Sequence, residues 1–297
     1  MGTEIIEFLS NNFSTVMSAV GSVTGGIITA IFLRNKTSTT EFEKIKAGQF
    51  EEVTNELLKS GKMTFTEYYK AKNFLSVAKK ADELYKQLPH EHEEESKCYD
   101  FDWFIRFYES VGNISNEKMQ DLWAKILAGK INNPSFYSLK TIDILKNIGQ
   151  KEAELFEKIC SYSIQSNNNY FIPNYDKYLE ACDIEYEDIM KLSEHDLIYN
   201  DALISLHING SSNNVLVHNN LILIQKNESN TLKEIDIKEF PFTVVGKEIA
   251  TLINKSAEEK DVLLFAKLIS EETGTNVDVH RIIRIEGNQI RYETKKI

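Results

Sequence analysis

The feature that most constrains this chain is a long stretch near its N-terminus without a charged side chain. It runs from Phe8 to Leu33, and its more apolar part, Phe13 to Leu33, has 21 residues. A helix of that length spans about 31 Å, close to the hydrocarbon thickness of a bilayer. Arg34 and Lys36 follow directly, whereas two glutamates precede the stretch. This asymmetry predicts a membrane helix in residues 1–36, with the rest of the chain in the cytoplasm.

The small residues of this stretch would gather on one side of the helix. Three glycines and six Ser or Thr residues make it only weakly hydrophobic, and Gly21 and Gly25 form a G-x-x-x-G motif, which lets helices approach closely in lipid. We therefore expect contact with lipid and self-association into a homo-oligomer. The alternative is a buried helix, or a helix that holds an oligomer together in water, and the chain would then be cytoplasmic. The expected membrane or oligomer face is Ser18, Gly21, Ser22, Gly25 and Thr29, flanked by Arg34 and Lys36.

Charge and cysteine content exclude several classes of protein. The net charge is −11, and residues 165–297 carry 22 acids against 14 bases. Nucleic acid is therefore an unlikely partner, because neutralisation of phosphates supplies most of the affinity of nucleic-acid binders. Cys98, Cys160 and Cys182 cannot all pair and none lies in a C-x-x-C motif, which argues against a disulfide scaffold and a structural zinc site.

The middle of the chain has the signals of consecutive helices. Capping boxes at Thr40–Glu43 and Thr64–Glu67 predict a helical hairpin over residues 37–89. Residues 90–99 form an acidic linker, in which two histidines beside carboxylates are a weak metal-site candidate. Aromatic and aliphatic residues recur at helical spacing over residues 100–165, with Ser115 as an expected N-cap, and this spacing predicts a packed core around Trp103 and Trp123.

Several motifs of this region resemble an uncharacterised bacterial family, the domain-of-unknown-function family numbered 2806. The similarity is best over residues 95–165 and rests on Asp102–Phe107, Asn116–Gln120, Leu122–Ile131 and Pro134–Thr141, with a weaker element at Phe242–Ile249. The family pattern tends to have Gly in the Pro-Gly-Ser-Phe turn and an acid after Ala-Gly, whereas Asn133-Pro134-Ser135-Phe136 lacks that Gly and Lys130 replaces the acid. The resemblance implies a mostly helical cytoplasmic body and supplies no catalytic residues.

Residues 166–297 predict a domain of mixed structure. A helix at Tyr186–Leu192, a hairpin around Asn219-Asn220, a helix that begins after Thr243 and a last hairpin around Glu286–Asn288 resemble a winged helix. The segment that would read DNA, Glu185–His195, holds four acids and a single lysine. We therefore expect an unknown protein partner on this acidic domain. A small basic cluster, from His280 to Arg284 with Lys295 and Lys296, is expected to be a solvated strand edge.

An enzymatic alternative rests on one short motif. Glu234, Asp236 and Lys238 alternate along an expected strand, and an acid-x-Lys element forms half of a metal-dependent nuclease site. No matching second acid is identifiable, and no phosphate-binding loop, H-E-x-x-H or G-x-S-x-G motif occurs. We therefore predict no catalytic, cofactor-binding or metal-ligating residue.

Together these patterns predict a mainly α chain with an α+β C-terminal part. The expected architecture is an N-terminal apolar helix, a helical body and a winged-helix-like C-terminal domain. The expected function is that of a non-enzymatic, membrane-associated, self-assembling bacterial protein, with a phage-defence effector or sensor as its most specific form. A soluble metal-dependent nuclease, or another cytoplasmic enzyme, is the alternative.

Overall fold

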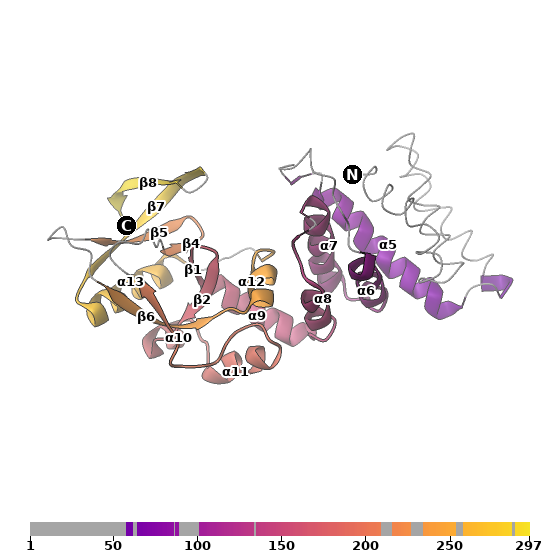
Figure 1. Ribbon diagram of the computed structural model, residues 1–297, viewed down its shortest axis with the longest axis horizontal. Helices are drawn as coiled ribbons and strands as arrows, with labels where there is room; N and C mark the ends of the chain where they lie inside the picture. Colours follow the sequence, from indigo (N-terminus) through magenta and orange to yellow (C-terminus); the bar gives the residue numbers. More distant parts are fainter. Residues whose placement is uncertain are drawn as a thin grey trace. The chain divides into compact units, whose positions relative to one another are not determined.

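The computed structural model describes residues 58–61, 64–85, 87–88, 101–133, 135–208, 216–226, 234–253, 258–286 and 289–297. The chain divides into two compact units, residues 1–146 and 147–297 (Figure 1). Each unit is described by itself. The predicted apolar helix with its Gly21/Gly25 face, the first capping box and the whole acidic linker, with Cys98, lie outside the described residues.

The described part of the first unit is helical. Its helices are α5 (Phe65–Tyr85), α6 (Phe101–Gly112), α7 (Glu117–Asn132) and α8 (Leu139–Leu145). The capping box predicted before α5 is present, since the Glu67 backbone N–H donates to Thr64 Oγ1 over 3.2 Å and the Thr64 backbone N–H donates to Glu67 Oε2 over 2.8 Å. The N-cap of α7 is Asn116, whose side chain accepts from the Met119 N–H, so the expectation of Ser115 is wrong.

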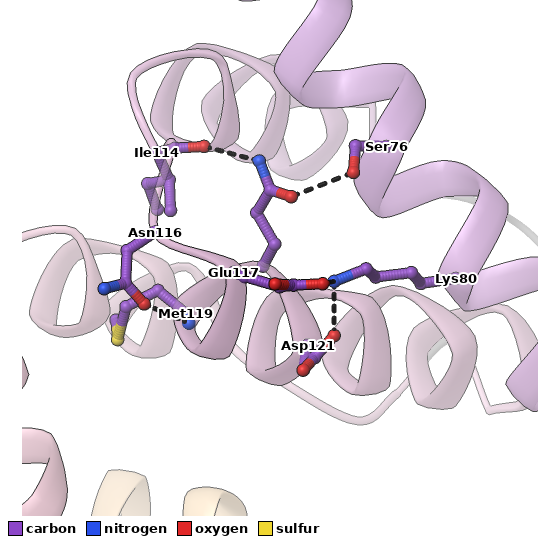
Figure 2. Close-up of polar contacts among 8 residues, drawn as sticks. Ser76, Lys80, Ile114, Asn116, Glu117, Met119 and Asp121 are labelled. Atoms are coloured by element: carbon purple, nitrogen blue, oxygen red, sulfur yellow. Dashed lines mark hydrogen bonds and ion pairs between the residues drawn. The ribbon is translucent and has the colours of Figure 1, made fainter.

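The core of this unit is aromatic, as the sequence predicted. Trp103 stacks on Phe107 at a centroid distance of 5.1 Å, and Phe107 meets the Trp123 ring edge-on at 5.4 Å. A polar contact joins α5 to α7 beside this core (Figure 2). Gln120 is buried, accepts from Ser76 Oγ over 2.8 Å and donates to the Ile114 carbonyl over 2.9 Å. Close by, Lys80 of α5 forms an ion pair with Asp121 of α7.

The second unit is built around a large antiparallel sheet. Its strand order is β3-β6-β2-β1-β4-β5-β7-β8, and every pairing is antiparallel. The strands are β1 (Ile164–Ser166), β2 (Asn169–Pro173), β3 (Ser205–Ile208), β4 (Leu216–His218), β5 (Leu221–Lys226), β6 (Ile235–Pro241), β7 (Asn276–Glu286) and β8 (Gln289–Lys296).

Helices cover both faces of this sheet at its centre. Phe171 and Ile172 are neighbours in β2 and therefore point to opposite faces, yet both are buried. Phe171 packs on Phe265 of α13. The helices of the unit are α9 (Gln150–Tyr162), α10 (Asp176–Ala181), α11 (Tyr186–Glu194), α12 (Val244–Ala250) and α13 (Glu259–Thr273).

The expected fold class is therefore wrong. The C-terminal part is not a winged helix with a small wing, because an eight-stranded sheet forms its centre. The hairpins at Asn219-Asn220 and at residues 286–289 are confirmed, but both belong to this one sheet. The physical reason is that β6 pairs with β2 and β3, and β5 pairs with β7, across long stretches of chain that local sequence patterns do not connect. Among the described helices, none is long and apolar enough to span a membrane.

Candidate protein-binding surface

α11 presents one buried and one exposed face. A capping box begins the helix, because the side chains of Glu185 and Asp188 each accept the other residue's backbone N–H. Ile189 and Leu192 are fully buried on the inner face. Tyr186 and Met190, one helical turn apart, are exposed on the outer face, and the Tyr186 ring also contacts Phe240 of β6.

The segment after α11 extends this exposed apolar area. Tyr186 Oη donates to the Asn200 carbonyl over 3.2 Å, and the Asn200 amide contacts Met190 Sδ at 3.0 Å. The segment is held in place because the Tyr199 N–H donates to the Pro241 carbonyl of β6 over 2.9 Å. Leu203 is 89% exposed and Tyr199 is 51% exposed. We call Tyr186, Met190, Tyr199 and Leu203 the α11 surface.

Acidic residues alternate with the residues of the α11 surface along the chain. Glu187 and Asp188 share Lys191, at 3.1 and 4.0 Å from its Nζ, while Glu194 and Asp201 lie between the residues of the surface in the sequence. The hydrogen bond with Glu187 raises the pKa of Lys191. The predicted protein-contact segment, Glu185–His195, is thus an amphipathic helix with an apolar outer stripe and an excess of carboxylates. Such an arrangement fits an apolar partner segment that carries basic residues.

The nuclease motif is engaged in ion pairs. Asp236 Oδ1 lies 2.8 Å from His207 Nδ1 on the neighbouring strand, and this hydrogen bond raises the pKa of His207. Lys238 Nζ lies 2.9 Å from Glu272 of α13. Glu234 is exposed just before β6. Within the described ranges, no group of three His, Cys, Asp or Glu residues is placed to hold a metal ion.

Two buried ionisable groups lie elsewhere in this unit. Burial raises the pKa of the Glu239 carboxyl in β6 to about 7. Burial, together with the charge of Asp261, raises the pKa of the Cys182 thiol to about 12. Because the thiolate is the nucleophilic form of cysteine, Cys182 stays unreactive near neutral pH. Cys160 is buried as well.

The basic cluster predicted near the C-terminus lies on the outer hairpin of the sheet. Arg281 pairs with Glu259, and Lys296 with Asp278. Arg284 of β7 and Arg291 of β8 are Cα partners across the ladder. Lys295 and Lys296 lie on β8, which is an edge strand, whereas His280–Arg284 lie on β7, which lies between β5 and β8, so the expected strand edge does not hold for them.

The family model described as "Protein of unknown function (DUF2806)" matches residues 62–263, about two thirds of the chain. The chain belongs to the DUF2806 family. No curated protein and no solved structure matches it. The resemblance noted from the sequence over residues 95–165 is thereby confirmed, and the match extends over the α11 surface as well.

The stronger motifs of the DUF2806 resemblance, within residues 102–141, lie in the first unit, whereas the weaker element at residues 242–249 lies in the second. Lys130 is buried, donates to the Phe136 and Tyr137 carbonyls over 2.9 and 3.3 Å, and lies 5.1 Å from the centre of the Trp103 ring. Gly129 faces Tyr137, and a β-carbon there would lie 2.6 Å from Tyr137 Cε2. The motif residues therefore hold the loop before α8 against α6 and α7.

Sequence reasoning located α11 but missed half of its exposed surface. Tyr199 and Leu203 follow the helix in a stretch without periodicity, so no pattern indicated that they would be exposed beside Tyr186. The only available signal was the occurrence of large apolar residues next to Asn200 and Asp201, which are turn formers.

Proposed function

We propose that this DUF2806 protein is a non-enzymatic, protein-binding component of the bacterial cell and that the α11 surface is its binding site. The observation that supports this most directly is the exposure of two tyrosines, a methionine and Leu203 on α11 and the segment that follows it. Tyrosine, methionine and other large side chains that bury well are typical of interface centres, and a charged rim sets which partners are accepted.

The chemistry of the surface specifies the partner. Its apolar centre favours a segment with two or three large apolar side chains. Its rim, from Glu187 to Asp201, favours arginine or lysine between them. Membrane association through residues 13–33 and a role in phage defence remain predictions from the sequence and are not needed for this proposal.

The test uses two synthetic peptides that share the same leucines and tyrosines, one with arginines and one with glutamates between them. Fluorescence anisotropy measures their binding to the full chain. We expect the arginine peptide to bind at least about tenfold more tightly, with an affinity that falls as salt rises. Equal binding of the two peptides would contradict the proposal.

Two matched variants distinguish binding at the α11 surface from non-specific binding to exposed apolar side chains. Leu203→Ser with Tyr199→Ser removes two exposed side chains and leaves Tyr186, which packs on Phe240, in place. Phe65→Ser with Tyr69→Ser removes two comparably exposed side chains from α5 in the other unit. We expect only the first variant to bind the arginine peptide more weakly, by about tenfold or more. Equal losses in both variants would show that the α11 surface is not the site.

A further inference from the structure

β3 is an outer strand of the sheet in the second unit. It stands at one end of the strand order, so among the described strands it has a neighbour, β6, on one side only. Edge strands expose backbone N–H and C=O groups that can pair with another chain. Which backbone groups of β3 are available for such pairing depends on which residues are hydrogen-bonded to β6.

Two hydrogen bonds of β6 fix this pattern. The Glu239 N–H donates to the Ile204 carbonyl, just before β3, over 3.1 Å. The Lys238 carbonyl instead accepts the Asn174 N–H over 2.9 Å, on the side of β6 that faces β2. The backbone groups of Glu239 therefore point to the β3 side and those of Lys238 point away from it. This orientation alternates from residue to residue along an antiparallel ladder.

The backbone groups of Ser205 and His207 consequently point outward. These residues are the Cα partners of Lys238 and Asp236, in the pairs that backbone hydrogen bonds do not join. Side chains lie closer in such pairs, which agrees with the 2.8 Å contact between His207 Nδ1 and Asp236 Oδ1. The outer edge of β3 thus offers two N–H donors and two carbonyl acceptors, spaced two residues apart as an added strand requires.

An apolar side chain also reaches this edge. Leu206 is only half-buried, although its Cα partner Ile237 is fully buried. Leu206 lies on the opposite face of β3 from Ser205 and His207, which are exposed. A strand added here would place apolar residues beside Leu206 and polar residues beside the other two. An alternation of apolar and basic residues, the pattern proposed for the partner of the α11 surface, suits both faces.

The outer edge of β3 is continuous with the α11 surface. Tyr199 of that surface donates its N–H to the Pro241 carbonyl, two residues along β6 from Glu239, which bonds to Ile204. Leu203 directly precedes Ile204, and β3 begins one residue later. A strand that is added to β3 and continues along β6 therefore runs toward Tyr199 and Leu203.

We infer that the partner of the α11 surface binds as an extended strand added to the outer edge of β3. This inference rests on the proposed function and names the conformation and the sequence pattern of its partner. Backbone hydrogen bonds to Ser205 and His207 supply affinity, whereas alternate side chains beside Leu206 and at the α11 surface supply specificity.

Methylation of the peptide backbone tests for an added strand. In an extended strand, successive N–H groups point to opposite sides, so only every second one can face β3. Two versions of the arginine peptide, with strictly alternating apolar residues and arginines, carry N-methyl groups at either the odd or the even positions. Fluorescence anisotropy with the full chain measures their affinities. We expect one version to bind at least about tenfold more weakly than the unmethylated peptide and the other to keep its affinity.

Proline substitutions test the same edge from the side of the protein. His207→Pro removes an outward N–H, at the kind of position where an edge strand tolerates proline. His207→Ala removes the same side chain and its contact with Asp236 but keeps the N–H. We expect the proline variant to bind the arginine peptide at least about tenfold more weakly than the alanine variant. Thermal melting checks that both variants are folded, and the methylated peptides decide the question if proline unfolds the strand.

The outcomes separate this inference from the proposed function. An arginine peptide that binds through the α11 surface, but loses affinity in both methylated versions or in neither, would overturn the added strand and leave the proposed function standing. Equal binding by folded proline and alanine variants would also overturn the inference. An arginine peptide that binds no more tightly than the glutamate peptide would remove both proposals.

Discussion

Gly246 lies directly against the backbone carbonyl oxygen of Leu197, with no room for a β-carbon between them. The same carbonyl accepts the Thr243 N–H over 3.0 Å, and Thr243 Oγ1 in turn accepts the Gly246 N–H over 3.0 Å. The first turn of α12 thus packs on the beginning of the segment that follows α11. The glycine of the family element at residues 242–249 is required by this close approach.

Replacing this glycine should destabilise the second unit. A β-carbon in Gly246→Ala overlaps backbone that no rotamer change can move, so we expect a loss of about 1–3 kcal/mol or more in the free energy of unfolding. Urea denaturation measures the loss. The control is Val244→Ala in the same helix, where the side chain is exposed and the change should stay within about 0.5 kcal/mol. A Gly246→Ala variant as stable as this control would contradict the packing described.

The buried carboxyl of Glu239 should make stability depend on pH. Burial raises its pKa to about 7, above its value of about 4.5 in the unfolded chain. The folded state therefore keeps a proton that the unfolded state releases between these values, and stability falls as the pH rises across that window. Glu239→Gln removes this loss, so the variant should be more stable than the wild type at pH 8 by up to about 3 kcal/mol and similar at pH 5.

Urea unfolding at the two pH values provides the measurement. Glu180→Gln, on the exposed face of α10, is the matched control and should behave like the wild type at both. A Glu239→Gln variant with the same advantage at pH 5 and pH 8 would show that the carboxyl does not titrate in this range.

The Ser76–Gln120 contact should couple α5 to α7. Gln120→Ala leaves the Ile114 carbonyl and Ser76 without the partner drawn in Figure 2, so we expect a loss of about 1–3 kcal/mol. Ser76→Ala alone should cost less, because its hydroxyl is only partly buried. A double-mutant cycle read from unfolding free energies should give a coupling of about 0.5–1.5 kcal/mol. Strict additivity would mean that the hydrogen bond contributes nothing.

Lys130 should tolerate neither of two opposite replacements. Lys130→Met keeps the length of the stem but removes the donor to the Phe136 and Tyr137 carbonyls, at a cost of about 1–3 kcal/mol. Lys130→Glu introduces the acid of the family pattern and should cost more, because a buried carboxylate would face those carbonyl oxygens. Urea denaturation of the wild type and both variants measures these losses in the free energy of unfolding. A more stable glutamate variant would show that the loop at residues 135–138 rearranges to accept it.

The sequence predicted the described helices better than the sheet, for a physical reason. The capping box at Thr64, the core around Trp103 and Trp123 and the cap at Thr243 are local signals, and each was found where expected. The turn at Asn219 is local too, and its positive φ suits asparagine. The pairing of β6 with β2 and β3 has no local signal, so the winged-helix expectation could not be corrected from the sequence.

In the candidate site too, the sequence indicated the local features but not those that depend on long-range contacts. Periodicity and charge identified α11 as an acidic protein-contact helix, an interpretation that still awaits a binding measurement. The segment after α11 is held by the Tyr199–Pro241 and Tyr186–Asn200 contacts, which join residues on different elements and which no local pattern indicates.

The order of the strands also matters while the chain is being made. β5 pairs with β7, but β6, α12 and α13 are synthesised between these two strands. Residue 276 follows residue 226 by 50 positions, which a ribosome covers in roughly 3–10 s. Throughout that interval the edge of β5, with Leu221 to Ile224, lacks its hydrogen-bonding neighbour and is open to pairing with other nascent chains. We therefore expect the second unit to depend on holding chaperones during synthesis more than the helical unit, whose partners lie close in sequence.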